Sequence, residues 1–174
     1  GVGQILCQWA AGLGAKVIGA VGSEAKAEIA LAHGCAHAIV LGRGNFAAKV
    51  RELTGGEGVA VVYDSVGKAT WEGSLDSLRP FGLMVTFGNA SGPVPPVSPL
   101  DLSAKGSLFL TRPALAHYTA RREDVLEAAR ELFAELVSGR VRVAAPGRFA
   151  LGAAAEAHRA LEERRTTGST ILVP

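Results

Sequence analysis

The sequence is poor in the residues that build metal sites and disulfide frameworks. It contains only 2 cysteines in 174 residues, and Cys7 and Cys35 stand alone, without a CxxC pair or a histidine at ligand spacing. We therefore expect no metal site. The sparse use of cysteine also favours a reducing, cytoplasmic setting.

The chain also lacks the charge and the long apolar runs that indicate a nucleic-acid or membrane partner. Its net charge is only +2, and its lysines and arginines do not cluster among aromatic residues. We find no run of about 18 apolar residues and expect no secretory signal. With 174 residues and 48% hydrophobic content, the chain is expected to be soluble and to bury a substantial core.

What the sequence does contain is a regular alternation of helical and strand-like segments, which predicts an α/β fold with a doubly wound parallel sheet. Ser23 and Asn45 are expected to cap the second and third helices. The apolar stretch 59–63 is typical of a strand buried on both faces. Residues 88–99 hold four prolines and are expected to form a loop. The predicted helices are 2–13, 24–33, 46–53, 69–78, 125–137 and 153–164, and the predicted strands are 16–21, 37–41, 59–63, 83–87, 107–110, 148–151, 169–173 and a short one near residue 141.

The first 22 residues have the pattern of the second half of a dinucleotide-binding turn, without the strand that precedes such a turn. Gly1 and Gly3 would allow the backbone to approach a phosphate, and the free N–H groups at the start of the helix would attract its charge. The alternative is a pair of packing glycines at an ordinary strand–helix junction.

The end of the strand 16–21 distinguishes between the two nicotinamide cofactors. An NAD site places Asp or Glu there to bind the ribose hydroxyls, but this strand is followed by Gly22 and Ser23. Lys26 lies one turn into the next helix, and a cation beside a hydroxyl suits a 2′-phosphate, so NADP is favoured. Alternatively, Ser23 is only a helix cap and Lys26 only a solvated charge. Glu24 is interpreted as a structural residue that complements the helix dipole.

Several motifs together resemble the NADPH:quinone oxidoreductases, the zeta-crystallin-like branch of the medium-chain, zinc-type alcohol dehydrogenase superfamily. The resemblance covers essentially the whole chain, in order and with little change in spacing. The motifs that carry it are GVGQILCQWA at 1–10, GAVGS at 19–23, VYDSVG at 62–67, FGNASG at 87–92, KGSL at 105–108 and TRPAL at 111–115.

This resemblance implies a Rossmann-like domain with an NADP site. It implies that Gly1 and Val2 contact the pyrophosphate and that Gly22, Ser23 and Lys26 contact the adenosine 2′-phosphate. Further along the cofactor it places Ser65 and Val66, and near the nicotinamide it places Phe87, Gly88, Asn89, Thr111 and Arg112. Arg164 would reach back to the phosphate end. A surface helix charge is the alternative interpretation of Arg164. Leu41 departs from the family, in which a tyrosine near the adenosine is frequent. No catalytic residue is assigned.

The resemblance also implies how the chain is divided and what it does. Residues 1–139 would form an N-terminally truncated NADP-binding domain that lacks its first strand, and residues 140–174 would return to a missing catalytic domain. The implied activity is hydride transfer from NADPH to a quinone or activated enone, with these 174 residues alone weak or inactive. A non-catalytic, crystallin-like NADPH-binding module remains an alternative, as does an enoyl reductase or alcohol dehydrogenase of the same superfamily. A homodimer through the edge strand near 105–110 is expected.

The remaining polar and aromatic residues receive simpler interpretations. Asp64 follows an apolar strand and is expected to accept hydrogen bonds from nearby backbone N–H groups rather than to act as a base. His117, with Tyr118, is the only candidate for a substrate contact. Trp9 and Trp71 are interpreted as packing residues.

Overall fold

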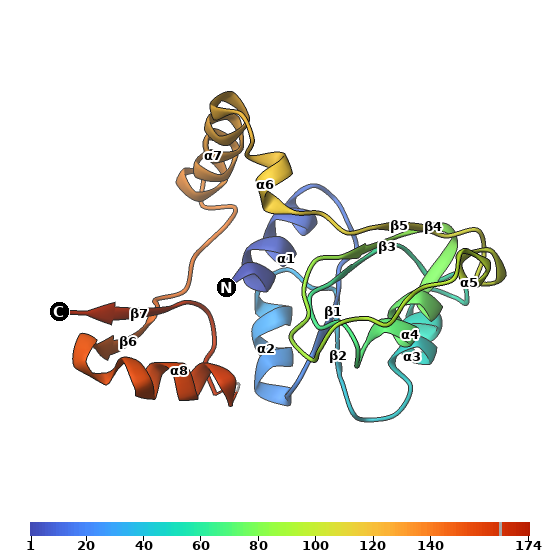
Figure 1. The fold of residues 1–174 in the computed structure, drawn as a ribbon, viewed down its shortest axis with the longest axis horizontal. Coiled ribbons are helices and arrows are strands. Elements are labelled where there is room, and N and C mark those ends of the chain that lie inside the picture. Colours follow the sequence, from blue (N-terminus) through green and yellow to red (C-terminus); the bar gives the residue numbers. More distant parts are fainter. Residues whose placement is uncertain (164) are drawn as a thin grey trace. The chain divides into compact units, whose positions relative to one another are not determined.

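The computed structural model describes residues 1–163 and 165–174, which fall into two compact units. The first unit comprises residues 1–40 together with 129–174, and the second comprises residues 41–128. Figure 1 labels the elements of both. Each unit is described by itself below.

The first unit opens with two helices that alternate with two parallel strands. The elements are α1 (Val2–Gly12), β1 (Ile18–Val21), α2 (Glu24–Ala32) and β2 (His37–Val40), and β1 pairs with β2 from Ile18↔His37 onward. The predicted cap of α2 is confirmed, because the Lys26 N–H donates to Ser23 Oγ at 3.4 Å. Gly34, with φ +93°, follows α2 in a conformation that favours glycine.

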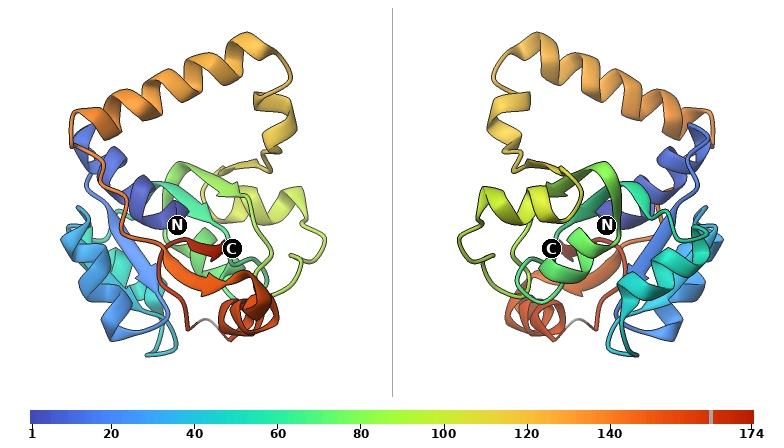
Figure 2. Two further views of the ribbon diagram at one scale, coloured as in Figure 1. Left: turned by 90° about the vertical axis from the view of Figure 1, so that its left-hand side faces the viewer. Right: turned by 90° about the vertical axis from the view of Figure 1, so that its right-hand side faces the viewer.

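The rest of the first unit comes from the C-terminal part of the chain. Helix α7 (Arg122–Val137) belongs to this unit from Ala129 onward. It is followed by β6 (Gly147–Ala150), η1 (Leu151–Ala153), α8 (Ala154–Glu162) and β7 (Thr170–Val173). Strands β6 and β7 pair in parallel, and Figure 2 shows α8 beside them. The expected strand near Val141 is wrong: in the described chain this side chain is buried without strand pairing.

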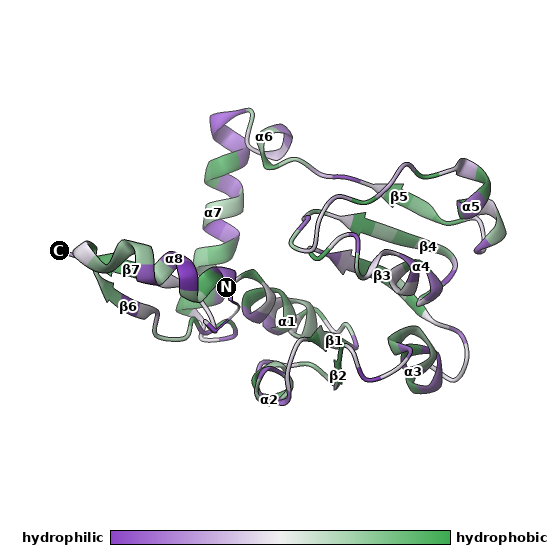
Figure 3. Cartoon of the chain, turned by 60° about the horizontal axis from the view of Figure 1, so that its bottom comes forward, coloured by the Kyte–Doolittle hydropathy of each residue, from purple (hydrophilic) through white to green (hydrophobic). Residues whose placement is uncertain are grey.

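Helix α7 confirms the predicted long helix, and its apolar and polar residues alternate in bands along the ribbon in Figure 3. Much of its apolar stripe is exposed, however. Phe133 is 60% and Val137 is 89% accessible in the described chain.

The second unit is built around a three-stranded parallel sheet with the order β3-β4-β5. Its elements are α3 (Phe46–Leu53), β3 (Val59–Asp64), α4 (Trp71–Asp76), β4 (Leu78–Thr86), α5 (Pro99–Ala104), β5 (Phe109–Thr111) and α6 (Leu115–Tyr118). The core between α4 and the sheet consists of Trp71, Leu75, Leu78, Met84 and Leu108. Trp71 is thus confirmed as a packing residue.

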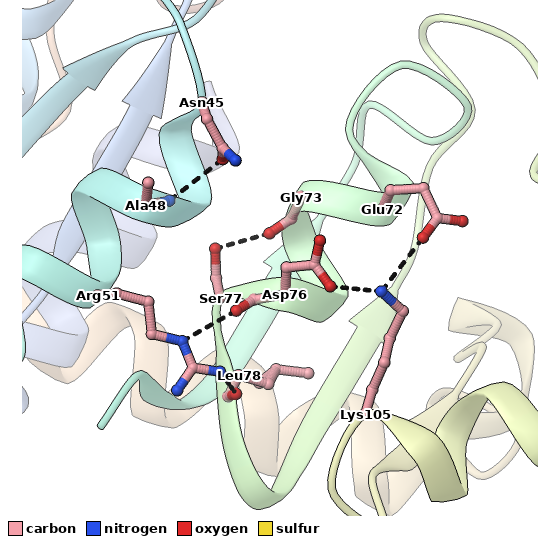
Figure 4. Close-up of polar contacts among 9 residues, drawn as sticks. All are labelled: Asn45, Ala48, Arg51, Glu72, Gly73, Asp76, Ser77, Leu78 and Lys105. Carbon is pink, nitrogen blue, oxygen red and sulfur yellow. Dashed lines mark hydrogen bonds and ion pairs between the residues drawn. The ribbon is translucent and has the colours of Figure 1, made fainter. Parts of the chain in front are cut away.

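Two cationic side chains, those of Arg51 and Lys105, bind to the ends of α4, as Figure 4 shows. The Arg51 guanidinium donates to the backbone carbonyls of Asp76 at 3.1 Å and Leu78 at 2.6 Å, and so satisfies carbonyls where the helix ends. Lys105 pairs with Asp76 and, at 3.3 Å, with Glu72 of the same helix. These contacts join α3, α4 and the turn before β5.

Three expectations for the second unit need correction. Strand β4 begins at Leu78 rather than at residue 83, because Leu78 already pairs with Val59 of β3. An irregular segment that includes Phe81, at φ +59°, shifts the register before the pairing resumes at Leu83. Helix α5 was not predicted; it begins at Pro99, behind the Ser98 cap. The expected burial of both faces of β3 is wrong, since Tyr63 is 58% exposed.

The predicted α/β class with parallel strands is confirmed, but the expected single sheet is divided. Within the described residues, β1 pairs only with β2, and β3 pairs only with β4.

Candidate cofactor site

The site residues of the first unit lie at the beginnings of two helices. Gly1 is the N-cap of α1, and no described side chain caps this helix end. Gly1, Val2 and Gly3 are exposed, and a Cβ added to either glycine would meet nothing within 4 Å. The first N–H groups of α1 are therefore accessible to an anionic group at the positive end of the helix.

The second helix start follows β1. Gly22 is exposed and has open space where a Cβ would stand, while Ser23 and Lys26 are half-buried. The segment between β1 and α2 contains no acidic residue, and Glu24 belongs to the exposed first turn of α2. Since the Ser23 oxygen accepts the helix hydrogen bond, its O–H group can still donate to a phosphate oxygen.

In the second unit, a buried carboxylate shapes the loop that follows β3. Asp64 is 4% exposed, and one of its oxygens accepts from the N–H groups of Val66 at 2.7 Å and Gly67 at 3.0 Å. The other oxygen accepts from the hydroxyls of Thr70 and Ser74, both at 2.7 Å. The expected bonding of Asp64 to backbone N–H groups is confirmed. The two hydroxyls extend this network to α4.

These contacts also determine the charge of Asp64. Burial alone would raise the pKa of this carboxyl, but the hydrogen bonds from Gly67, Thr70, Ser74 and Val66 together lower the pKa below its ordinary value of 3.8. Asp64 is therefore ionised and engaged at neutral pH. A proton-accepting role in a reaction would weaken the hydrogen bonds by which Asp64 organises the loop.

The loop after β3 is joined to the loop after β4. Ala90 N–H donates to Ser65 O at 3.2 Å, and Ser91 N–H donates to Val66 O at 2.8 Å. The Ser91 hydroxyl donates to the same Val66 carbonyl at 2.7 Å. Between the loops lies Gly88, where an added Cβ would stand only 2.8 Å from Ser65 Cα. Two segments implied in the same site, 65–66 and 87–89, are thus brought into contact.

Two cavities open in the second unit. The first has a volume of about 300 Å³. Most of its lining side chains are apolar, among them Trp71 and Leu110, and its polar lining includes Asn89 and Arg112. The other, of about 270 Å³, is lined by residues 111–114 with His117 and Tyr118. Arg112 borders both cavities. The second cavity brings the predicted substrate-contact residues beside Thr111 and Arg112.

The structure distributes the predicted site residues between the two units. The first unit holds Gly1, Val2, Gly22, Ser23 and Lys26, and the second holds Ser65, Val66, Phe87, Gly88, Asn89, Thr111 and Arg112. Arg164 lies outside the described residues. Within each unit the residues lie at strand ends, helix starts and loops, as open α/β sheets place their ligand sites.

The two cysteines share no motif in the sequence but lie in contact in the structure. Cys7 Sγ and Cys35 Sγ lie 3.2 Å apart, although the residues are 28 positions apart in the chain. The sequence could not predict this contact, because the two cysteines are far apart in the chain. They meet only where α1 packs against the turn after α2. The described residues contain no cluster of three or more potential metal ligands. They also contain no helix with the length and apolar character needed to cross a bilayer.

Comparison with known proteins defines the class. The sequence model of the zinc-binding dehydrogenase family matches residues 1–135, so the chain belongs to this family. Among curated relatives, quinone oxidoreductase of Salmonella typhimurium is 53% identical over 100% of the chain, and 2-haloacrylate reductase of a Burkholderia species is 46% identical, also over 100% of the chain. The chain spans about half the length of these relatives, 54% and 53%.

A solved structure confirms the Rossmann-like fold. Escherichia coli quinone oxidoreductase, crystallised in complex with NADPH, matches with a TM-score of 0.95 and 48% identity. The match covers 100% of this chain and 54% of that one. The resemblance to the NADPH:quinone oxidoreductases, inferred from motifs, is thereby confirmed.

Proposed function

We propose that this chain is the NADP-binding part of an oxidoreductase that transfers hydride from NADPH to a quinone or another activated enone. The observation that carries this proposal is the pair of helix starts in the first unit: an open α1 terminus at Gly1, and a hydroxyl and a cation after β1 where an NAD site would place an acid. The NADPH complex of the Escherichia coli relative supports it.

The donor groups on this chain fit the cofactor. The N–H groups at Gly1 and Val2 would bind the pyrophosphate. Gly22, Ser23 and Lys26 would bind the 2′-phosphate through an N–H group, a hydroxyl and an ammonium. When bound, NADPH supplies the hydride. Arg164 would assist at the phosphate end.

The second unit would position the nicotinamide end. Ser65 and Val66 would lie along the cofactor, and their loop is held in place by Asp64. Phe87, Gly88, Asn89, Thr111 and Arg112 would surround the nicotinamide. The cavity beside Asn89 and Arg112, lined largely by apolar side chains, would border this end of the cofactor. No residue of this chain is assigned as a covalent nucleophile in the hydride transfer.

The substrate class follows from what the relatives act on. Their names specify a quinone and a 2-haloacrylate. Both contain a carbon–carbon double bond conjugated to a carbonyl or carboxylate carbon, and such conjugated systems accept hydride. The same proposal includes the division of the chain. Residues 1–139 would form the cofactor domain, and residues 140–174 would belong to a catalytic domain. We also propose a cytoplasmic location.

Two substitutions test the cofactor assignment in the natural full-length protein. Lys26→Ala removes one charge–phosphate contact and should raise the KM for NADPH by about tenfold, the effect of losing about 1.4 kcal/mol of binding. Ser23→Asp retains a good helix cap but adds negative charge, so it should weaken NADPH binding and leave NADH binding equal or stronger. Steady-state oxidation of each nucleotide with a simple quinone measures both effects.

Lys49→Ala is the matched control, because Lys49 is an exposed lysine that pairs with Glu52 on α3. Its NADPH kinetics should equal those of the parent protein. If Lys26→Ala and Ser23→Asp leave the preference for NADPH over NADH unchanged, the 2′-phosphate site lies elsewhere. If the parent protein oxidises neither nucleotide yet binds NADPH, the crystallin-like alternative is correct.

We further propose a homodimer that pairs along β5 and the preceding turn from residue 105. In the described chain β5 is the edge of its sheet, with Phe109 61% and Leu110 37% exposed. An unpaired edge with exposed apolar side chains is suited to pairing with a second copy. Phe109→Lys should shift the natural protein from dimer to monomer in sedimentation velocity, whereas Leu31→Lys, at an exposed apolar site on α2, should not.

A further inference from the structure

The two cysteines form a confined thiol pair that the cofactor chemistry does not use. Cys7 lies in α1 and is half-buried, while Cys35 lies in the turn between α2 and β2 and is 6% exposed. Their sulfur atoms are 3.2 Å apart, and both are free thiols. A disulfide requires a separation of about 2.05 Å, so the sulfurs need to approach by only about 1 Å.

The surrounding backbone holds Cys35 against Cys7. Its sulfur would lie 3.1 Å from a Cβ placed on Gly19 of β1, so the strand leaves little room behind the thiol. At the neighbouring position, a Cβ on Gly34 would lie 3.3 Å from the Cys7 carbonyl oxygen. The turn therefore rests directly on α1. The pair can react without separating either element from its partners.

We propose that Cys7 and Cys35 are a redox-active dithiol that closes to an intramolecular disulfide when the protein meets a hydroperoxide. The Cys7 thiolate attacks one peroxide oxygen, the O–O bond breaks, and the released oxygen takes up a proton and leaves as water or an alcohol. Cys7 is then a sulfenic acid. The Cys35 sulfur attacks the Cys7 sulfur, the S–O bond breaks, and water leaves with the Cys35 proton. Two electrons pass from the thiols to the peroxide.

The contact between the sulfurs assigns the two roles. The hydrogen bond from Cys35 lowers the pKa of Cys7 to about 7, although burial acts to raise it. The same hydrogen bond raises the pKa of Cys35, as burial also does. Cys7 is thus the thiolate, and it is the more accessible of the two, so it attacks the peroxide. Cys35 is protected until the sulfenic acid forms beside it.

Peptide mapping of the natural full-length protein tests the disulfide without any substitution. The protein is treated with hydrogen peroxide, its remaining thiols are alkylated, and tryptic peptides are analysed by mass spectrometry without reduction. The expected product is a cross-link between the peptide that ends at Lys16 and the peptide 27–43, lost on reduction. Oxidation of Cys7 to sulfinic acid with Cys35 unmodified, pairing of either residue with another cysteine, or no oxidation at all would each overturn the proposal.

A variant series tests the assignment of roles. Cys35→Ala removes the hydrogen-bond donor, so alkylation of Cys7 by iodoacetamide at neutral pH should slow by about tenfold, because an ordinary thiol is only a few per cent ionised there. Cys35→Ser retains a donor and should recover part of the rate. Equal Cys7 rates in the parent and both variants would show that Cys35 does not activate Cys7, and would reject the mechanism.

Discussion

Replacement of Asp64 by alanine is expected to destabilise the protein by about 4 kcal/mol, among the largest effects of any single substitution in the chain. The carboxylate accepts four hydrogen bonds in a buried setting, from the N–H groups of Val66 and Gly67 and the hydroxyls of Thr70 and Ser74. Alanine leaves these donors without their acceptor, and a buried unsatisfied donor costs about 1–3 kcal/mol. Chemical denaturation of parent and variant measures the loss.

Asp76→Ala is the matched control, since Asp76 lies on α4 and loses a partly exposed ion pair with Lys105, which still pairs with Glu72. Exposed pairs contribute about 0–1 kcal/mol, so this variant should remain close to the parent. Asp64→Asn should fall between the two, because an amide oxygen can still accept from the backbone N–H groups. If Asp64→Ala and Asp76→Ala have equal unfolding free energies, the network does not stabilise the fold.

The sign of the pH dependence follows from the lowered pKa of Asp64. A carboxyl whose pKa is lower in the folded than in the unfolded state contributes stability above its unfolded pKa of about 3.9. That contribution is lost as the pH falls through the folded-state value. The difference in unfolding free energy between the parent and Asp64→Asn should therefore be constant near neutral pH and shrink in acid.

Local signals in the sequence predicted those parts of the fold that local chemistry determines. The caps at Ser23 and Asn45 and the alternation of helix and strand are correct, since each depends on residues close in the chain. The same holds for Asp64, because its backbone donors are its own neighbours. Helix α5 was missed because the proline-rich composition around it conceals the Ser98–Pro99 start, where proline is tolerated.

Contacts that join distant segments were not visible in the sequence. The Cys7–Cys35 pair, the Arg51 contacts with α4 and the pairing of the loops at Ser65 and Gly88 all depend on how elements pack. Family resemblance placed residues 65–66 and 87–89 in one site, and the structure supplies the physical reason for their contact. The irregular start of β4 has no local signature either, because it follows from pairing with β3.

The loop crossing at Gly88 gives the second large expected effect, in stability and cofactor binding together. A Cβ at this position would stand 2.8 Å from Ser65 Cα and 2.9 Å from its carbonyl carbon. These are backbone atoms, so no side-chain rotation can relieve the overlap. We expect Gly88→Ala to force the loops apart, at a cost of about 3 kcal/mol.

The same displacement should disturb the proposed nicotinamide end, since Ser65, Val66 and Asn89 lie in the two loops. We expect NADPH affinity in the natural full-length protein to fall at least about tenfold, measured by fluorescence titration at a temperature where the variant remains folded. Gly12→Ala is the matched control: it lies in α1 with open space at its Cβ position and should gain about 0.5–1 kcal/mol of stability. Equal stabilities for the two variants would mean that the loops can separate without cost. A folded Gly88→Ala protein with parent NADPH affinity would instead place the cofactor away from this crossing, and would reject the assignment of residues 65–66 and 87–89.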